Sequence, residues 1–405
     1  MKKILIVGGG INQIPLILAS KKEGYYVIVV DSAGYKCPSY NHVDKFYSIS
    51  TQDEETILEI ARKERIDGII SNSELCMLVV NSIAEKLHLT GNPVNGISAL
   101  MSKSRFRALQ KRIGLFTPKH YEVTSTTEAI SIAERLQYPI IVKPCESSGS
   151  RGCCKLDQFE NNKVQLAFQR GRHYSRNDKV VIEEFVTMPS LRTIEGDVFV
   201  FGDNIIWDGM FYTTRASWAP MVPMTYTGPL LIEKAQMESI KAAVTSIFSE
   251  AKILFGEFNI EGFFTGTGEF FVIEINVRQG GNFLPLFLKR FTGIDYDRLL
   301  VTTCVGDMDY YNTVISSERT GRYVIMNSVY SPKSGVYKGL KCDKTVKDKI
   351  INITELLPIG DRVSECVDGT GIVASVMIEC DSLKELYDLT PQINECIQVD
   401  IKGIS

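Results

Sequence analysis

The stretch FFVIEINVRQGG, residues 270–281, decides how the chain is interpreted, because a carboxylate interrupts a run of strand-forming side chains. Phe270, Phe271, Val272, Ile273 and Ile275 are aromatic or β-branched, a composition typical of a strand buried on both faces of an α/β sheet. Glu274 is therefore expected inside the protein. Since an unpaired buried carboxylate costs several kcal/mol, it should be matched by a cation or a hydrogen-bond donor.

Strand periodicity supplies partners for this carboxylate. Side chains two residues apart share a face, so Glu274, Asn276 and Arg278 point the same way. The run FNIEGFF, residues 258–264, predicts a second strand, and the turn TGTG makes an antiparallel hairpin that brings Glu261 toward Glu274. Because Mg²⁺ prefers carboxylate and amide oxygens, these residues predict a magnesium site with Arg278 placed to contact phosphate. The alternative is a set of polar residues at a solvent-exposed strand end.

The composition is that of a protein with more than one core. A chain of 405 residues with 44% hydrophobic side chains is long enough for two or three domains. A net charge of -3, without a basic cluster that alternates with aromatics, argues against nucleic acid as a partner. None of the ten cysteines forms a CxxC pair, which predicts reduced thiols and a cytoplasmic location. Glycines 8–10 interrupt the apolar N-terminal run, so we expect neither a signal peptide nor a membrane segment.

The pattern of strands and helices divides the chain into three parts. Residues 1–93 alternate strand and helix signals, which predicts a small doubly wound α/β unit. Its helix over 53–64 is expected to begin with a capping box made by Thr51 and Glu54. A basic amphipathic helix starts at Lys103 and should end at Gly114. The region to about residue 310 then has α+β character, and residues 311–405 contain short β-like pieces.

The loop ESSGSRGCC, residues 146–154, is a candidate phosphate-binding segment. Its glycines let successive backbone N–H groups turn toward one anion, and Lys143 ends the preceding strand, where its ammonium can reach a phosphate. A surface turn rich in glycine and serine is the alternative, and Lys103 taken alone fits a solvated helix charge. The segment VVIEEFV, residues 180–186, can offer backbone groups to an adenine edge or be an acidic strand terminus.

In this order, the motifs resemble those of the ATP-grasp superfamily, within it the carboxylate–amine ligases related to biotin carboxylase, the purine-pathway ATP-grasp enzymes and L-amino acid ligases. The stretches that carry the resemblance are SKSRFRALQKRIGLFTP, IIVKPCESSGSRGC, VIEEFV and IEINVRQGG. It implies a Rossmann-like pre-ATP-grasp domain over 1–93, an ATP-grasp domain over 94–310 with a mobile lid at about 118–186, and a small β-rich C-terminal domain over 311–405.

The resemblance also implies ATP and Mg²⁺ (or Mn²⁺) as cofactors. Lys103 and Lys143 would contact ATP phosphates, and Arg278 would steady the substrate carboxylate or its phosphorylated form. Magnesium would be held by Glu261, Glu274 and Asn276. The other nucleotide-binding positions would be Ser147, Ser148, Gly149, Arg151 and Gly152 in the loop, and Glu183, Glu184, Phe185 and Val186 around adenine. The sequence departs from the family at Thr187–Ser190, which stand where relatives place a ribose-holding acid, and in a hairpin one residue longer than that of biotin carboxylase.

The implied reaction is phosphorylation of a small-molecule carboxylate by ATP to an acyl phosphate, followed by attack of an amine, in a homodimer. Candidate substrate residues are Arg215, which lies in the aperiodic stretch FYTTRASWAPMVPMTYTG, and the N-terminal Gly9 and Gly10. An NAD-dependent oxidoreductase is a second hypothesis, because a glycine-rich turn follows the first strand, although Gln13 replaces the third glycine of a dinucleotide motif. A non-catalytic nucleotide-binding protein is the third.

Overall fold

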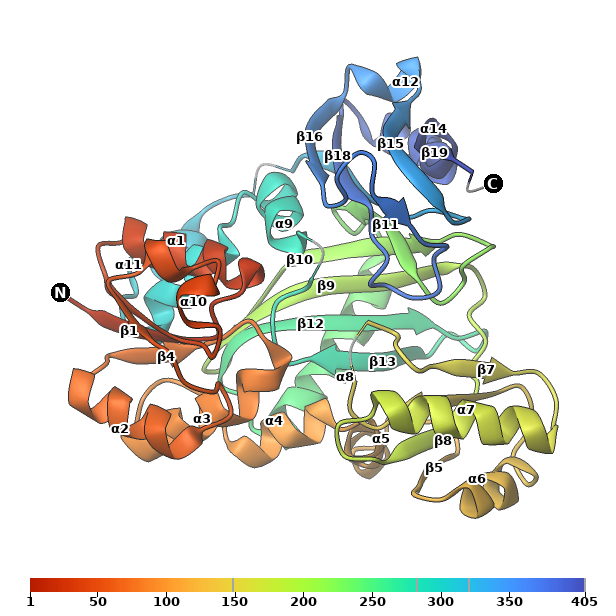
Figure 1. The fold of residues 1–405 in the computed structure, drawn as a ribbon, viewed down its shortest axis with the longest axis horizontal. Helices are drawn as coiled ribbons and strands as arrows, with labels where there is room; N and C mark the ends of the chain where they lie inside the picture. The colour runs from red at the N-terminus through yellow and green to blue at the C-terminus, as the bar shows by residue number, and fades with distance from the viewer. Residues whose placement is uncertain (148, 282, 320, 404–405) are drawn as a thin grey trace.

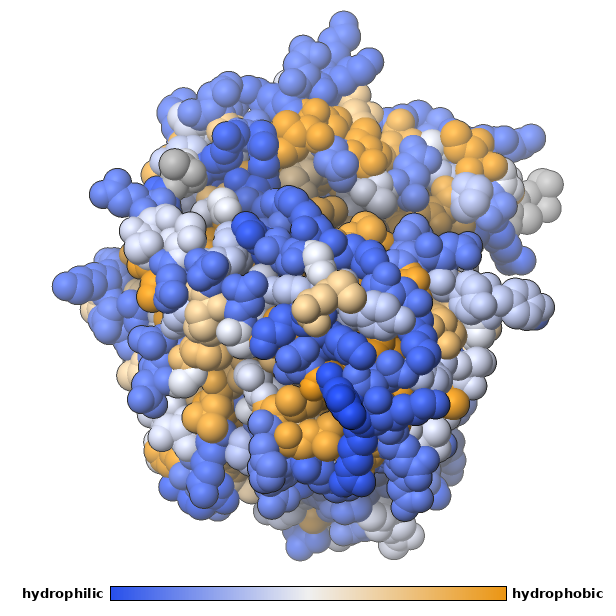
Figure 2. Space-filling view, turned by 90° about the vertical axis from the view of Figure 1, so that its left-hand side faces the viewer, coloured by the Kyte–Doolittle hydropathy of each residue, from blue (hydrophilic) through white to orange (hydrophobic). Residues whose placement is uncertain are grey.

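The computed structural model describes residues 1–147, 149–281, 283–319 and 321–403. Its N-terminal unit is a parallel sheet in the order β3-β2-β1-β4, which confirms the predicted doubly wound start (Figure 1). The strands are β1 (Lys3–Val7), β2 (Tyr26–Val30), β3 (Lys45–Tyr47) and β4 (Gly68–Ile70), and the helices are α1 (Ile14–Lys22), α2 (Glu54–Glu64) and α3 (Met77–Leu87). Figure 2 shows the side of the molecule on which this N-terminal unit lies. Its surface is mostly hydrophilic, and the hydrophobic side chains form small separate patches.

The predicted capping box of α2 is wrong. The N-cap is Asp53, whose side chain accepts a hydrogen bond from the Thr56 backbone N–H, and not Thr51. An Asp directly before the first helical residue satisfies this donor without a reciprocal partner, which makes Thr51 unnecessary. Glu54 instead accepts hydrogen bonds from Ser82 and Lys86 of α3 and so joins the two helices.

Two helices connect the N-terminal unit to the rest of the chain. They are α4 (Val94–Met101) and α5 (Lys103–Arg112), and Ser102 between them caps α5. The turn after α5 passes through Gly114 with φ of 77°, a conformation that favours glycine, as predicted. The start of α5 thereby places Lys103 beside the central sheet.

A separate antiparallel sheet in the order β5-β8-β6-β7 occupies residues 120–184. It consists of β5 (His120–Val123), β6 (Ile140–Pro144), β7 (Cys154–Leu156) and β8 (Val180–Glu184), and it carries α6 (Thr126–Ala133) and α7 (Asn161–Tyr174). These elements share their own hydrophobic core around Val142, Phe168 and Val180. In Figure 1 this subdomain lies beneath the edge of the central sheet. We call it the lid subdomain.

The central sheet has eight strands in the order β13-β12-β9-β10-β11-β14-β18-β16. The bounds are β9 (Arg192–Phe201), β10 (Asn204–Arg215), β11 (Pro223–Gly228), β12 (Phe255–Phe264), β13 (Phe270–Asn276), β14 (Tyr323–Val329), β16 (Ile350–Glu355) and β18 (Ala374–Cys380). Helix α8 (Lys234–Ala251) packs on one face, and α9 (Leu284–Thr292), α10 (Tyr296–Cys304) and α11 (Asp309–Ser316) lie between the other face and the N-terminal unit. The mixed α/β and α+β fold class is confirmed.

The C-terminal residues extend this sheet and add a second one. Strands β14, β18 and β16 continue the central sheet beyond residue 310, and a small sheet has the order β17-β15-β19. The remaining bounds are β15 (Gly335–Cys342), β17 (Arg362–Val363), β19 (Ile397–Lys402), α12 (Lys344–Lys347), α13 (Leu383–Leu389) and α14 (Ile393–Cys396). Over the described residues, every helix is too short or too polar to cross a bilayer.

Candidate active site

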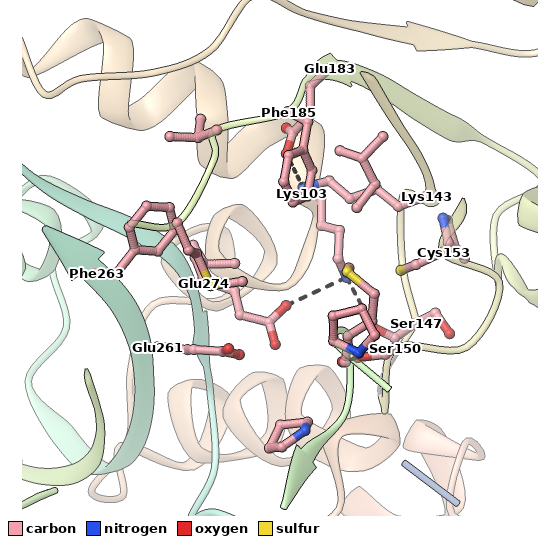
Figure 3. Close-up of a pocket in the computed structure, with 18 of the residues that line it drawn as sticks. Lys103, Lys143, Ser147, Ser150, Cys153, Glu183, Phe185, Glu261, Phe263 and Glu274 are labelled. Carbon is pink, nitrogen blue, oxygen red and sulfur yellow. Dashed lines mark hydrogen bonds and ion pairs between the residues drawn. The ribbon is translucent and has the colours of Figure 1, made fainter. Parts of the chain in front are cut away.

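A cleft opens between the lid subdomain and the β12–β13 edge of the central sheet (Figure 3). The lid subdomain contributes Ile141 and Lys143, the segment after β8 contributes Phe185 and Val186, and the sheet contributes Glu261, Phe263, Phe271 and Glu274. Lys103 projects from α5, and Ser147, Gly149, Ser150 and Arg151 border the cleft from the glycine-rich loop. The cleft therefore has an apolar part lined by phenylalanines and a charged part lined by lysines and carboxylates. Ser148 lies outside the described residues.

A row of carboxylates crosses three neighbouring strands. Glu261 on β12 is directly opposite both Glu274 on β13 and Glu195 on β9, so the predicted hairpin and its register are confirmed. A register shift follows Glu261, between it and Gly262. Phe199, on the same face of β9 as Glu195, packs in the core beneath α9 and α10. Beyond these helices, toward the cleft, the side chains on this face of the strand are acidic. This change explains why acids interrupt otherwise apolar strands.

The expectation that β13 is buried on both faces is wrong. Ile273, Glu274 and Asn276 are partly exposed, and the Glu274 side chain retains 33% of its accessible surface. The physical reason is that β13 is the edge strand of the sheet and one of its faces lines the cleft. The Glu274 carboxylate does have a cationic partner, because Lys103 Nζ lies 3.8 Å from its Oε2.

The predicted metal ligands lie together, and each acid faces a cation. Glu261 forms an ion pair with Arg215, whose side chain is 5% exposed. Asn276 donates to Asn259 Oδ1 at 3.1 Å and lies 3.4 Å from Glu274 Oε1. Two carboxylates and an amide are oxygen donors suited to a hard divalent cation. Over the described part of the chain, no group of three or more His, Cys, Asp or Glu side chains is arranged to hold a metal.

Electrostatics make this row receptive to positive charge. Burial and the neighbouring Glu274 charge raise the pKa of Glu261, while Arg215 opposes the rise. Burial and Glu261 together raise the pKa of Glu195 to about 8. Like charges held on adjacent strands disfavour ionisation, and a cation placed between them reverses that effect. The acids therefore fit a site that binds a cation.

The two predicted lysines occupy different environments. Lys103 Nζ donates to Ser147 O at 3.0 Å, which ties the start of α5 to the glycine-rich loop. Burial alone would lower the Lys103 pKa, but Glu274 and the other acidic groups nearby together outweigh it, and the pKa is raised. Lys143 is buried against Glu183, and here burial dominates, so its pKa is lowered. Both ammonium groups line the cleft.

The structure places Glu183 in the wall of the cleft and Glu184 outside it. The Glu183 carboxylate is 6% exposed and pairs with Lys143 and with Arg107, whose Nε lies 3.1 Å away. Glu184 is not among the residues that line the cleft, because its carboxylate accepts from the Gln137 backbone N–H at 3.1 Å. Phe185 and Val186 do line it. On an alternating strand only every second side chain can face the cleft.

Arg107 is a buried residue of the site that the sequence analysis missed. Its side chain is 1% exposed and donates to Gln110 Oε1 at 2.8 Å and to Val272 O at 3.3 Å, besides Glu183. It links helix α5, the lid subdomain and β13. The available signal was its position four residues after Lys103, which puts both on one side of the helix.

Arg278 lies in a second cavity, of about 410 Å³, between the N-terminal unit and the start of α9. Its guanidinium donates to Gln279 O at 2.7 Å and lies 3.9 Å from Glu74. Glu74 borders both this cavity and a small pocket lined by Lys103, Glu274 and Asn276, so the two spaces are neighbours. Arg151 lines both the cleft and the second cavity.

The N-terminal glycines serve mainly the local fold. Gly9 N–H donates to Asp31 Oδ2 at 2.9 Å, and a side chain at Gly9 would meet Ser39 Oγ at 2.4 Å. Neither Gly9 nor Gly10 lines the second cavity, although residues 11–13 do. In dinucleotide-binding folds the acid at the end of the second strand holds the ribose. Here the corresponding acid is Asp31, and its carboxylate accepts hydrogen bonds from the backbone N–H groups of Gly9 and Ala33.

Comparisons with known proteins agree with this architecture. Residues 109–304 match the family model of the D-ala D-ala ligase C-terminus. The carbamoyl phosphate synthase large chain of Gemmatimonas aurantiaca is 25% identical over 328 residues, which cover 76% of this chain and 29% of that protein. The chain thus spans less than a third of that relative's length.

Solved structures match nearly the whole chain. The L-amino acid ligase from Bacillus licheniformis has a TM-score of 0.81 at 18% identity, covering 100% of this chain and 99% of that one. The biotin carboxylase domain of Hydrogenobacter thermophilus 2-oxoglutarate carboxylase, in complex with MgADP, ADP and bicarbonate, has a TM-score of 0.71 at 17% identity, covering 99% and 91%. The chain thus has the fold of the ATP-grasp ligases and, over residues 109–304, resembles the D-ala D-ala ligase C-terminus.

Proposed function

We propose that the protein is an ATP-dependent carboxylate–amine ligase that works through an acyl phosphate. The observation that carries the proposal is the shared cleft, where Lys103, Lys143 and the glycine-rich loop face Glu261 and Glu274 across a space that is apolar at one end. Lysines and backbone donors suit phosphates, paired acids suit Mg²⁺, and an aromatic wall suits a nucleobase. A neighbouring cavity is available for the second substrate.

Each part of the cleft then has a role. Phe185, Val186, Phe263 and Phe271 would enclose adenine, and the ammonium groups of Lys103 and Lys143 would contact the phosphates. Glu261, Glu274 and Asn276 would hold Mg²⁺, which supplies charge neutralisation on the phosphate oxygens when bound. Arg215, paired with Glu261 at the cleft wall, would orient that carboxylate. Arg278, in the second cavity, would hold the substrate carboxylate as a planar fork.

The chemistry would proceed in two steps. A carboxylate oxygen attacks the γ-phosphorus, the bond from that phosphorus to the β–γ bridging oxygen breaks, and ADP leaves. The amine nitrogen next attacks the acyl carbon, phosphate leaves, and the nitrogen loses a proton to form the amide. The lysines stabilise the charge that develops on the transferring group, and the lid subdomain excludes water that would hydrolyse the acyl phosphate.

The test is ADP release in the presence of ATP, Mg²⁺ and a panel of carboxylates, with hydroxylamine as the amine. Wild-type protein should form ADP and a hydroxamate together. Glu274→Gln should lower this rate about a hundredfold or more, because one ligand and one charge are lost at the reacting phosphates. Glu269→Gln is the matched control, since Glu269 lies at the exposed hairpin turn and should leave the rate unchanged. Equal loss in both variants would contradict the proposal.

The proposal includes a homodimer, which light scattering on the purified protein tests. A monomer at micromolar concentration would contradict the homodimer and leave the proposed reaction unaffected.

A further inference from the structure

The charged side chains that line the second cavity come from separate units of the fold. Glu74 belongs to the N-terminal unit, Arg278 to the turn after β13 and Asp297 to α10, whereas Arg151 and Arg176 belong to the lid subdomain. With three arginines against two acids, the wall is net positive. Without the two lid arginines, two acids face one arginine and the wall is net negative. The position of the lid subdomain therefore decides whether the cavity attracts an anion.

Arg176 is held at the cavity by an ion pair that joins the lid subdomain to the N-terminal unit. Its guanidinium lies 3.2 Å from Glu74 Oε1, and the two side chains are 26% and 10% exposed. The Arg176 backbone N–H donates to Glu146 O at 3.2 Å, and Asn177 Nδ2 donates to Glu146 Oε1 at 2.9 Å. The segment that carries Arg176 is thus fixed to the start of the glycine-rich loop, so the ion pair holds both in place.

The lid subdomain has a hydrophobic core of its own and so can move as one body. Its charged contact with α5, between Glu183 and Arg107, lies near the end of β8, whereas Arg176 precedes the start of that strand. The subdomain is therefore anchored to α5 at one place and to Glu74 at another. Loss of the second anchor alone would leave the subdomain attached at α5 and free to open.

Glu74 also lies beside the arginine assigned to the substrate. Its Oε2 is 3.9 Å from Arg278, a distance that gives electrostatic attraction without a hydrogen bond. An anion bound to Arg278 offsets that attraction and adds a negative charge near Glu74. The two negative charges repel each other unless a second cation stays close, and Arg176 is that cation. An anion in the second cavity therefore favours the closed position of the lid subdomain.

We propose that an anion bound in the second cavity holds the lid subdomain closed over the nucleotide through Arg176 and Glu74, so that the two cavities bind their ligands cooperatively. Such coupling is reciprocal, and a nucleotide in the cleft strengthens anion binding by the same factor. The identity of the anion as the substrate carboxylate rests on the proposed function, whereas the coupling rests on the charges. Arg176 lines the second cavity but not the cleft, so it is a positioning residue with respect to the nucleotide.

The test is the rate at which fluorescent N-methylanthraniloyl-ADP leaves the protein in Mg²⁺, because the lid subdomain must open to release it. The probe anion is sulfate, compared with chloride at equal ionic strength. In the wild type, sulfate should slow release about fivefold or more, as for a coupling between two binding sites. Arg176→Gln should release the nucleotide roughly fivefold faster in chloride, as for the loss of a partly exposed ion pair, and sulfate should no longer slow it.

Three further variants separate this coupling from a loss of stability. Arg176→Lys keeps the charge and should retain part of the sulfate effect. The double variant of Glu74→Gln and Arg176→Gln should release the nucleotide no faster than either single variant, because the two side chains act as a pair. Arg172→Gln is the matched control, since Arg172 lies on α7 of the same subdomain, is 53% exposed and lines neither cavity. It should leave both release rates unchanged.

The outcomes are distinct from those of the ligase assay. Release that sulfate does not slow in the wild type, or still slows equally in Arg176→Gln, would overturn the coupling; the latter result would place sulfate in the cleft itself. An Arg176-dependent sulfate effect without hydroxamate formation supports the coupling and contradicts the proposed ligase activity. Hydroxamate formation by a protein whose nucleotide release ignores both sulfate and Arg176→Gln leaves the ligase activity standing and overturns the coupling.

Discussion

Glu183→Gln tests whether the buried charges behind the cleft hold the lid subdomain in place. The Glu183 carboxylate joins Arg107 of α5 to Lys143 of β6, and all three side chains are at most 7% exposed. A glutamine keeps the size of the side chain and removes its charge. Arg107 and Lys143 then remain buried without a counterion, which is the costly way to break a buried ion pair.

Two routes give the size of the effect. Removing one partner of a buried pair costs about 3–5 kcal/mol. Burial opposes ionisation of Glu183, yet Arg107 and Lys143 outweigh it and lower its pKa from 4.5 to about 2. At about 1.4 kcal/mol for each tenfold change in proton affinity, this difference corresponds to about 3 kcal/mol. The contribution is present above pH 4.5 and is lost as the pH falls toward the folded-state pKa.

Hydrogen exchange in the lid strands is the direct assay, because it reports local opening. At neutral pH, amides of β6 and β8 in Glu183→Gln should exchange roughly a hundredfold faster than in the wild type, as a loss of about 3 kcal/mol requires. Glu184→Gln is the matched control on the same strand. Its carboxylate is partly exposed and 3.6 Å from an exposed Lys119, so the variant should lose less than about 1 kcal/mol. Equal exchange in the two variants would refute the structural role of Glu183.

Three further outcomes follow from the site. Gly280→Ala should lower kcat/KM at least tenfold, since a Cβ there would lie 2.4 Å from the buried Leu284 Cδ1 and 3.1 Å from the buried Asp197 and Asn259, beside the turn that carries Arg278, whereas Gly281→Ala, with nothing within 4 Å, should be neutral in the same assay. Burial raises the Asp297 pKa to about 6, so its stability contribution is lost as the pH rises through 6; the melting temperature of Asp297→Asn should not show this fall between pH 4 and 7. Burial and a neighbouring acid raise the Glu195 pKa from 4.5 to about 8, so in metal chelator the wild type should lose stability as the pH rises from 4.5 through 8, and Glu195→Gln should not.

The chemistry-bearing strands were predictable because their signal is local. Period-two alternation and the short TGTG turn fix the hairpin, and with it the pairing of Glu261 with Glu274. A helix that starts at Lys103 and a strand that ends near Lys143 follow from equally local patterns. Motif order along the chain then indicated the superfamily.

Contacts between distant segments were not predictable in the same way. Glu183 is the counterion of Arg107, and Arg107 is buried, because the lid subdomain packs on α5. The local sequence around either residue does not predict this packing. The aperiodic stretch around Arg215 is a strand hairpin, β10 and β11, whose register shifts between Thr214 and Arg215, so alternation was hidden there. The position of Arg278 in a separate cavity likewise depends on how the chain turns after β13.

The charged side chains of the cleft are already paired with one another, and this pairing determines what must accompany a nucleotide when it binds. Arg107, Glu183 and Lys143 link α5 to the lid, and Lys103 on the same helix faces Glu274 on the sheet. A triphosphate placed near Lys103 would compete with Glu274 for that ammonium and add negative charge beside Glu261. A cation that accompanies the phosphates removes both conflicts, because it replaces Lys103 as the partner of Glu274. Nucleotide binding at this cleft should therefore depend on the divalent cation even before any phosphoryl transfer.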